Sequence, residues 1–168
     1  MAYKALVIDY QKCTGCRNCE LVCSVFNEGV ANPYKARIKV EKWEWEGLYI
    51  PVTCRQCVDA PCVAVCPVKA LSRDETLGRV VVNHDLCIGC RSCVTVCPFG
   101  AMGWNPETKK VYKCDLCEGD PQCVRFCYEK AVDYVDVSRE PILKKREAAE
   151  RIAEAHKKAV ELTLAETP

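Results

Sequence analysis

The sequence lacks a long hydrophobic run. No stretch of its 168 residues approaches the roughly 18 apolar residues that a membrane span requires. Met1 is followed by AYKALVIDY, which has no basic start, no apolar core and no small-residue cleavage site. We therefore expect no membrane span and, most simply, a protein of the reducing cytoplasm. Export together with a signal-bearing partner stays an alternative.

The sequence also lacks an excess of either charge. Its 24 Lys and Arg residues face 23 Asp and Glu residues, the formal net charge is +1, and no strongly basic face stands out. This balance argues against binding of nucleic acid. The sequence contains no nucleophile–base pair, phosphate-binding loop or dinucleotide fingerprint, so we expect no catalytic chemistry from this chain alone.

Ordinary hydrophobic residues are scarce, and cysteine takes their place. The apolar fraction of 49% includes 16 cysteines, so the supply of aliphatic and aromatic side chains for a core is thin. Cysteine at this density indicates disulfides or metal. We expect something other than aliphatic packing to help hold the fold together.

The cysteines fall into four groups of four, with none left over. Group one is Cys13, Cys16, Cys19 and Cys23; group two is Cys54, Cys57, Cys62 and Cys66; group three is Cys87, Cys90, Cys93 and Cys97; group four is Cys114, Cys117, Cys123 and Cys127. The chain is thus internally repetitive.

The spacing within the groups predicts iron–sulfur clusters. Groups one and three read C-x2-C-x2-C-x3-C, in which three thiols of one tight loop reach three irons of a cubane. The fourth thiol lies further along a helical turn and binds a different cluster. Disulfides need an oxidising compartment, and structural zinc takes C-x2-C pairs separated by longer stretches. The sequence therefore favours 4Fe–4S clusters, with zinc as the main alternative.

Residues beside the cysteines repeat as well. Gly15 and Gly89 precede the second cysteines of groups one and three, where a missing Cβ lets the loop approach a cluster and aim its N–H groups at sulfur. The segments CPVKAL, CPFGAM and CYEKAV end groups two, three and four, and we expect their Ala70, Ala101 and Ala131 where a short helix meets a cluster. Strand candidates are ALVIDY, RVVVNH, KKVYK and VDYVDV, with turns in SRDETLG and WNPETKK. Cysteine loop, short helix and β-hairpin together predict a ferredoxin-like unit, present twice.

The groups can pair in two ways. Sequential pairing joins group one with two and three with four, whereas nested pairing joins two with three and one with four. The shorter connection between groups two and three favours nesting. Pro67 and Pro98 follow the last cysteines of groups two and three, while Ser24 and Tyr128 follow those of groups one and four, which also favours nesting. Independent drift at two sites is the alternative explanation of the missing prolines.

Nested pairing defines four ligand sets. They are Cys13, Cys16, Cys19 with Cys127; Cys114, Cys117, Cys123 with Cys23; Cys54, Cys57, Cys62 with Cys97; and Cys87, Cys90, Cys93 with Cys66. Four clusters so close together in one chain would allow single electrons to pass from cluster to cluster.

The four groups resemble the iron–sulfur electron-transfer subunits of molybdenum and tungsten oxidoreductases, such as formate dehydrogenase, dimethyl sulfoxide reductase and nitrate reductase. The likeness covers about residues 3 to 137. It implies four 4Fe–4S clusters held by all sixteen cysteines, in the nested pairing that is the rule in that family. The chain lacks the long insertions and the membrane anchor of the larger members.

Within that family the chain is most similar to the small four-cluster subunit of tungsten-dependent aldehyde oxidoreductases. The resemblance implies a role between a tungstopterin (or molybdopterin) catalytic subunit and a flavin subunit that uses NAD, or a ferredoxin. Further copies of the chain itself are also candidate partners. The alternatives are the iron–sulfur subunit of another oxidoreductase, such as formate dehydrogenase or benzoyl-CoA reductase, and a free polyferredoxin.

The expected architecture is an α+β fold with four parts. Residues 1–30 with 108–138 form the first ferredoxin-like unit, from groups one and four, and residues 54–107 form the second, from groups two and three. Residues 31–53 form an inserted β-hairpin. Residues 139–168 form an amphipathic helix that docks either on these units or on a neighbouring subunit.

The inserted hairpin carries a pair of tryptophans. Ile38 and Val40 alternate with charged residues, and Trp43 and Trp45 then alternate in the opposite register. This predicts a bulge or turn near Lys42. We expect the tryptophans either to shield the small core of the hairpin or to cover a cluster or contact a partner. Trp104, which follows CPFGAM, has the same two interpretations.

Overall fold

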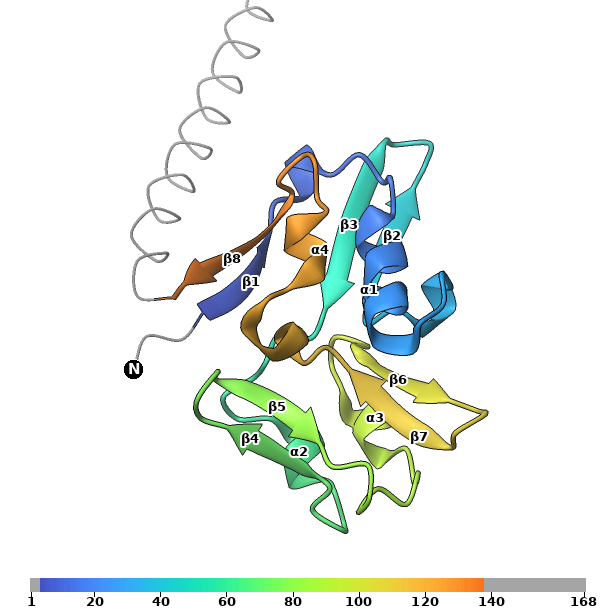
Figure 1. The fold of residues 1–168 in the computed structure, drawn as a ribbon, viewed down its shortest axis with the longest axis vertical. Coiled ribbons are helices and arrows are strands. Elements are labelled where there is room, and N and C mark those ends of the chain that lie inside the picture. Colours follow the sequence, from blue (N-terminus) through green and yellow to red (C-terminus); the bar gives the residue numbers. More distant parts are fainter. Residues whose placement is uncertain (1–3, 138–168) are drawn as a thin grey trace, which may run out of the picture. The chain divides into compact units, whose positions relative to one another are not determined.

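The α-helices begin within the cysteine groups. In the computed structural model, which describes residues 4–137, they are α1 (Asn18–Glu28), α2 (Pro61–Ala64), α3 (Ser92–Val96) and α4 (Gln122–Arg125) (Figure 1). Each helix carries the third cysteine of its group. Ala70, Ala101 and Ala131 do not stand where a helix meets a cluster, as the sequence predicted, because after groups two, three and four the chain turns directly into a strand. The C-terminal helix expected over 139–168 lies outside the described residues.

The strands pair two by two. The pairs are β1 (Lys4–Ile8) with β8 (Val132–Asp136), β2 (Ile38–Trp43) with β3 (Leu48–Thr53), β4 (Leu71–Asp74) with β5 (Arg79–Val82), and β6 (Met102–Asn105) with β7 (Lys110–Lys113). The last three pairs are antiparallel hairpins. Short 3-10 turns occur at Tyr10–Lys12, Pro33–Lys35 and Leu116–Gly119. All four strand candidates from the sequence are confirmed.

The turns of two hairpins form as their sequences indicate. In the hairpin of β4 and β5, the Oδ1 atom of Asp74 accepts the N–H of Thr76 at 2.9 Å. In the hairpin of β6 and β7, the Oδ1 atom of Asn105 accepts the N–H of Glu107 at 2.9 Å. Such side-chain capping of the backbone is why Asp and Asn are favoured in turns.

The inserted hairpin turns two residues after Lys42. Its ladder continues without a bulge to the pair Trp43 and Leu48, so of the bulge or turn predicted near Lys42 the turn is the one found. The turn follows Trp43 and contains Gly47, whose φ of +64° suits glycine. Trp43 is half exposed and Trp45 is fully exposed, so this pair does not shield a core within the described structure.

The core consists of two apolar clusters that include cysteines. Helix α1 packs against α4, and α2 packs against α3. The first cluster contains Cys19, Cys23, Cys123, Ala36, Ile38, Val40 and Val132, and the second contains Cys62, Cys93, Leu71, Val80, Met102 and Val111. The helix pairs thus join group one to four and group two to three.

Residues Lys4–Val135 form one compact unit. The division of the chain into two ferredoxin-like units stays a prediction. Within residues 4–137, no helix combines the length and the apolar character needed to cross a membrane.

Candidate metal centres

The first two cysteines of every group are joined by the same left-handed turn. The residue before the second cysteine has a positive φ in each case: +70° at Gly15, +49° at Gln56, +72° at Gly89 and +61° at Leu116. The two glycines indicated this turn in groups one and three. Sequence reasoning missed it at Gln56 and Leu116, because residues with a Cβ seldom adopt this conformation.

The two glycines are required by their neighbours as well as by the turn. A Cβ on Gly15 would lie 2.5 Å from Cδ1 of Tyr49, and a Cβ on Gly89 would lie 2.5 Å from the carbonyl oxygen of Lys109. The nearby N–H of Gly15 acts to lower the pKa of the Cys13 thiol, although burial outweighs it and the pKa is raised. Each cysteine loop is therefore pressed against an adjoining hairpin.

The last cysteines of groups two and four accept a backbone hydrogen bond in the same way. The N–H of Ala70 lies 3.2 Å from Sγ of Cys66, and the N–H of Ala131 lies 3.2 Å from Sγ of Cys127. Lys69 and Lys130, directly before these alanines, have positive φ. Both alanines are buried, so only a small side chain fits. Their role is thus to bring an N–H group to sulfur, not to join a helix to a cluster.

Group one ends differently. Cys23 and Ser24 lie inside α1, and Ser24 is fully buried with its Oγ donating to the carbonyl oxygen of Leu21 at 2.8 Å. Tyr128, in contrast, begins the turn that leads from Cys127 to its N–H donor. Only Ser24 lies in a helix interior, which excludes proline there, so the two missing prolines do not share one local cause. That their absence labels a pair stays an interpretation.

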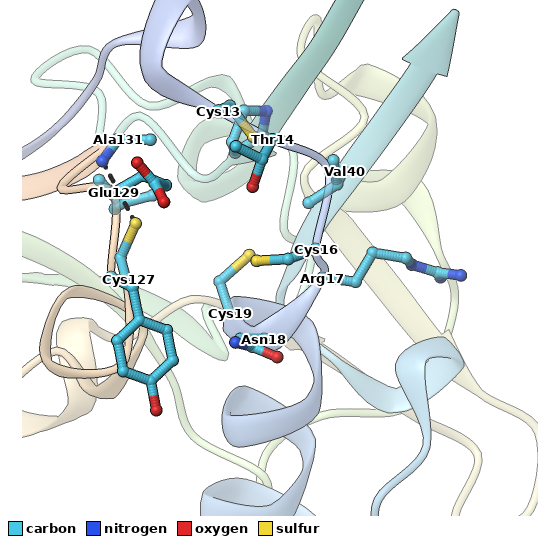
Figure 2. Close-up of a pocket in the computed structure, with 13 residues that line it drawn as sticks. Cys13, Thr14, Cys16, Arg17, Asn18, Cys19, Val40, Cys127, Glu129 and Ala131 are labelled. Atoms are coloured by element: carbon cyan, nitrogen blue, oxygen red, sulfur yellow. Dashed lines mark hydrogen bonds between the residues drawn. The ribbon is translucent and has the colours of Figure 1, made fainter. Parts of the chain in front are cut away.

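One pocket gathers cysteines from groups one and four. Its lining includes Cys13, Cys16, Cys19 and Cys127, together with Val40 and Ala131 (Figure 2). Figure 2 shows Cys127 on the opposite side of the pocket from Cys16 and Cys19. The pairing of β1 with β8 brings the two groups together, although they are far apart in sequence. Directly beside these strands, the N–H of Asp9 donates to the carbonyl oxygen of Ala131 at 2.8 Å.

Two further pockets have the same composition. The second is lined by Cys23, Cys114, Cys117 and Cys123, and the third by Cys54, Cys57, Cys62 and Cys97. Each combines three cysteines of one group with the last cysteine of another. The remaining set is less enclosed: Cys66, Cys87 and Cys93 pack in the second apolar cluster, and Cys90 is exposed.

Burial controls the acidity of the thiols. It raises the pKa of Cys19 to about 12 and that of Cys93 and Cys114 to about 11. It also raises the pKa of Cys123. Cys90 is different, because the hydroxyl of Ser92, 3.5 Å from its Sγ, lowers its pKa. Binding of metal to the buried thiols therefore displaces protons.

Two arginines hold the segment that carries Cys117 in place. Arg37 pairs with Asp115 at 2.7 Å. Arg79 is buried, pairs with Asp74 at 3.0 Å and with Glu118, and donates to the carbonyl oxygen of Asp115 at 2.7 Å. These contacts hold the short segment that carries Cys117 against β2 and β5.

Trp104 belongs to the core beside group three. It packs on the second apolar cluster, and the guanidinium of Arg91 lies 4.3 Å from the centre of its ring. This is a core position, as one interpretation of Trp104 predicted; that it covers a metal cluster or contacts a partner stays a prediction.

The donor chemistry of these pockets fits a 4Fe–4S cluster. Each set offers four thiols from a tight loop and one distant segment, which is the arrangement that cubane clusters take. N–H groups directed at Cys23, Cys66 and Cys127 add the hydrogen bonds to sulfur that tune such clusters.

Comparison with known proteins agrees with this chemistry. Residues 45–137 match the 4Fe-4S dicluster domain, and residues 10–27 match a 4Fe-4S binding domain. A Pyrococcus furiosus protein named aliphatic sulfonate oxidoreductase, polyferredoxin-like subunit, is 45% identical over 79% of this chain and 76% of its own length. The putative electron transport protein YsaA of Escherichia coli is 42% identical over 80% of this chain and 90% of its own length.

A solved structure shares the fold. The active-site complex BamBC of benzoyl coenzyme A reductase contains a chain that matches with a TM-score of 0.50 at 24% identity, covering 96% of this chain and 98% of that one. At this identity the likeness concerns the fold alone. From the matched domain and the curated relatives, the chain belongs to the 4Fe-4S dicluster family of ferredoxin-like proteins, and its sixteen cysteines fit several 4Fe–4S clusters.

Proposed function

We propose that the chain holds four 4Fe–4S clusters in nested pairs and relays single electrons between two partner proteins. The composition of the three pockets carries this proposal, because each combines three cysteines of one group with the last cysteine of its nested partner. We name the sites after these sets: site 1 (Cys13, Cys16, Cys19, Cys127), site 2 (Cys114, Cys117, Cys123, Cys23), site 3 (Cys54, Cys57, Cys62, Cys97) and site 4 (Cys87, Cys90, Cys93, Cys66).

The sites form a linear sequence. Helix α1, with Cys19 and Cys23, packs against α4, with Cys123, and α2, with Cys62, packs against α3, with Cys93. Gln56, beside Cys57, donates to the carbonyl oxygen of Cys114 at 2.8 Å. Sites 1 and 2, sites 2 and 3, and sites 3 and 4 are thus neighbours.

The two end sites are the places where electrons enter and leave. Cys16 of site 1 and Cys90 of site 4 are exposed, whereas Cys114 and Cys123 of site 2 are buried. Bound clusters supply the one-electron redox chemistry. The chain positions the thiols, buries three of the four thiols of site 2 and directs N–H groups at sulfur.

The partners follow from the family resemblance. We propose a pterin-cofactor catalytic subunit, with tungsten or molybdenum, at one end and a flavin subunit that uses NAD, or a ferredoxin, at the other, in an aldehyde oxidoreductase. The Pyrococcus furiosus relative, named as a subunit of an aliphatic sulfonate oxidoreductase, makes sulfonate chemistry the second candidate. Purification of the native complex, followed by tungsten, molybdenum and flavin analysis, tests this assignment; recovery of the chain without a stable partner would favour a free polyferredoxin.

Iron counting in double variants tests the pairing. The intact chain should contain about four irons per cluster, about sixteen in all, with matching sulfide. Cys13→Ser and Cys127→Ser should alter the same cluster, so the double variant loses or converts one cluster, as each single variant does. Cys23→Ser combined with Cys127→Ser should alter two clusters, those of sites 2 and 1.

Sequential pairing predicts the opposite for the first double variant. It would place Cys127 with group three, so Cys13→Ser and Cys127→Ser together would alter two clusters. Electron paramagnetic resonance of the reduced protein counts the clusters directly. Zinc in place of iron, without labile sulfide, would refute the whole proposal.

A further inference from the structure

Lys113 is a buried cation whose hydrogen bonds all end on uncharged oxygens. Only 3% of the residue is exposed. Its Nζ donates to the carbonyl oxygen of Val80 at 2.5 Å, to the carbonyl oxygen of Cys114 at 2.7 Å and to Oε1 of Gln56 at 3.1 Å. These three bonds use all three protons of the ammonium group.

The arginines nearby are held in a different way. Arg37 is bound to the carboxylate of Asp115, and Arg79 is bound to the carboxylates of Asp74 and Glu118. Their charges are thus compensated by side chains. Burial of a cation without such compensation is unfavourable, so the charge of Lys113 requires another source of negative charge.

Lys113 lies at the junction of site 2 and site 3. Cys114 is a member of site 2, and Val80 lines the pocket of site 3. The ammonium group thus binds the backbone of a residue that lines each of the two pockets, Cys114 in the pocket of site 2 and Val80 in that of site 3.

Gln56 holds the ammonium group in place. Its Oε1 accepts the N–H of Val80 at 2.9 Å as well as Nζ of Lys113, while its Nε2 donates to the carbonyl oxygen of Cys114 at 2.8 Å. The orientation of the amide is determined by these partners, because the reverse orientation would direct N–H groups at two donors. The left-handed turn between Cys54 and Cys57 presents Gln56 to this junction.

We propose that Lys113 is a fixed positive charge that raises the reduction potentials of the clusters in sites 2 and 3, with Gln56 as its positioning residue; this rests on the proposed function. A cubane with four cysteinate ligands is a dianion when oxidised, and it becomes a trianion when it takes up one electron from a partner, with no bond made or broken. A nearby positive charge stabilises the trianion more than the dianion, and net charge is one of the factors that set cluster potentials. Electrons arriving at either end site are thereby drawn toward the middle of the chain.

Redox titrations of the iron-loaded full chain, followed by electron paramagnetic resonance, test this inference. Lys113→Met removes the charge and keeps much of the side-chain volume. Two of the midpoint potentials should become more negative. At the wild-type midpoint, the ratio of oxidised to reduced cluster should rise about tenfold, equivalent to about 59 mV for a one-electron couple. Lys113→Arg retains the charge and should stay within about twofold of wild type.

Lys109→Met is the matched control, because Lys109 is an exposed lysine next to the strand that carries Lys113. Solvent screens its charge, so the potentials should change less than about twofold in the same ratio. Unchanged potentials in iron-replete Lys113→Met would overturn the inference, and so would an equal shift in Lys113→Arg.

If Lys113→Met takes up less iron than the wild-type chain, Gln56→Glu provides the second test. The new carboxylate would stand within hydrogen-bond distance of Nζ and compensate its charge, so the same two potentials should fall while Lys113 remains. Potentials within twofold of wild type in this variant would overturn the inference. Failure of the proposed function is distinguishable from failure of this inference. It would appear as missing iron, or as a different cysteine pairing, in chains that keep both Lys113 and Gln56.

Discussion

The sulfur of Cys23 accepts a hydrogen bond from the backbone N–H of Arg37, 3.2 Å away and fourteen residues further along the chain. In groups two and four the corresponding donor is only four residues from the sulfur. Group one differs because α1 continues beyond Cys23 to Glu28, so its donor must come from the inserted segment before β2. The insertion thus completes the hydrogen bonding of a group one sulfur.

Proline substitutions directly after the last cysteine of group one and after that of group four should differ in their effect on the protein. Ser24→Pro should destabilise the protein by about 3 kcal/mol or more, because a proline inside a helix removes a hydrogen bond and clashes with the preceding turn. Tyr128→Pro should leave iron content intact, because Pro67 and Pro98 stand at the equivalent places in groups two and three. Thermal unfolding and iron analysis of both variants measure the difference.

Ser24→Ala is the control for loss of the hydroxyl, which donates to Leu21 and accepts the N–H of Asn32 at 3.0 Å. It should cost about 1 kcal/mol. Equal stability of Ser24→Pro and Tyr128→Pro would contradict the assignment of Ser24 to a helix interior.

Two glycines with similar backbone conformations should tolerate alanine very differently. Gly89 has φ of +72° and Gly100 has φ of +60°. Placing a Cβ on backbone of this left-handed conformation costs roughly 1–2 kcal/mol at either position. The Cβ of Gly89→Ala would also lie 2.5 Å from the carbonyl oxygen of Lys109, whereas that of Gly100→Ala meets nothing within 4 Å. Gly89→Ala should therefore lower the melting temperature further and release iron sooner on heating; equal losses would show that the close approach is unimportant.

Features repeated in the sequence were the ones that sequence reasoning recovered. The cysteine groups, the strands and the turn glycines could be predicted because ligand spacing, β-branched runs and left-handed turns act over a few residues. Helices α2 and α4 span only four residues each, too short for a helical period to be visible.

Contacts between distant segments were not accessible in the same way. Gln56 and Lys113 lie 57 residues apart in sequence, and neither belongs to a motif that indicates the other. Arg37 became a hydrogen-bond donor to Cys23 only through the path of the inserted hairpin. Such partners depend on packing of whole elements, which local pattern does not specify.

Arg79 should contribute more to stability than a surface arginine with a similar partner. Its side chain is 8% exposed and joins β5 to the segment of Cys117 through Asp115 and Glu118. Arg79→Ala leaves the carbonyl oxygen of Asp115 without this donor and should cost about 1–3 kcal/mol.

Arg125→Ala provides the comparison. The side chains of Arg125 and Asp120 are 66% and 69% exposed, with 3.6 Å between Nη1 and Oδ2. Such surface pairs contribute about 0–1 kcal/mol. Thermal unfolding of the two variants under one buffer condition measures the difference; a larger loss in Arg125→Ala would be inconsistent with the structure.

The thiols of group three should differ in their reaction with iodoacetamide when metal is absent. Thiolate is the reactive form. The hydroxyl of Ser92 lowers the pKa of exposed Cys90, while burial raises the pKa of Cys93 to about 11. At neutral pH, Cys90 should therefore be alkylated first, and Cys93 should react appreciably only as the pH rises toward 11. Ser92→Ala should move the pH profile of Cys90 upward and leave exposed Cys16 unchanged, as peptide mapping by mass spectrometry would show. Alkylation of Cys93 as fast as Cys90 at neutral pH would mean that group three does not keep this geometry without its cluster.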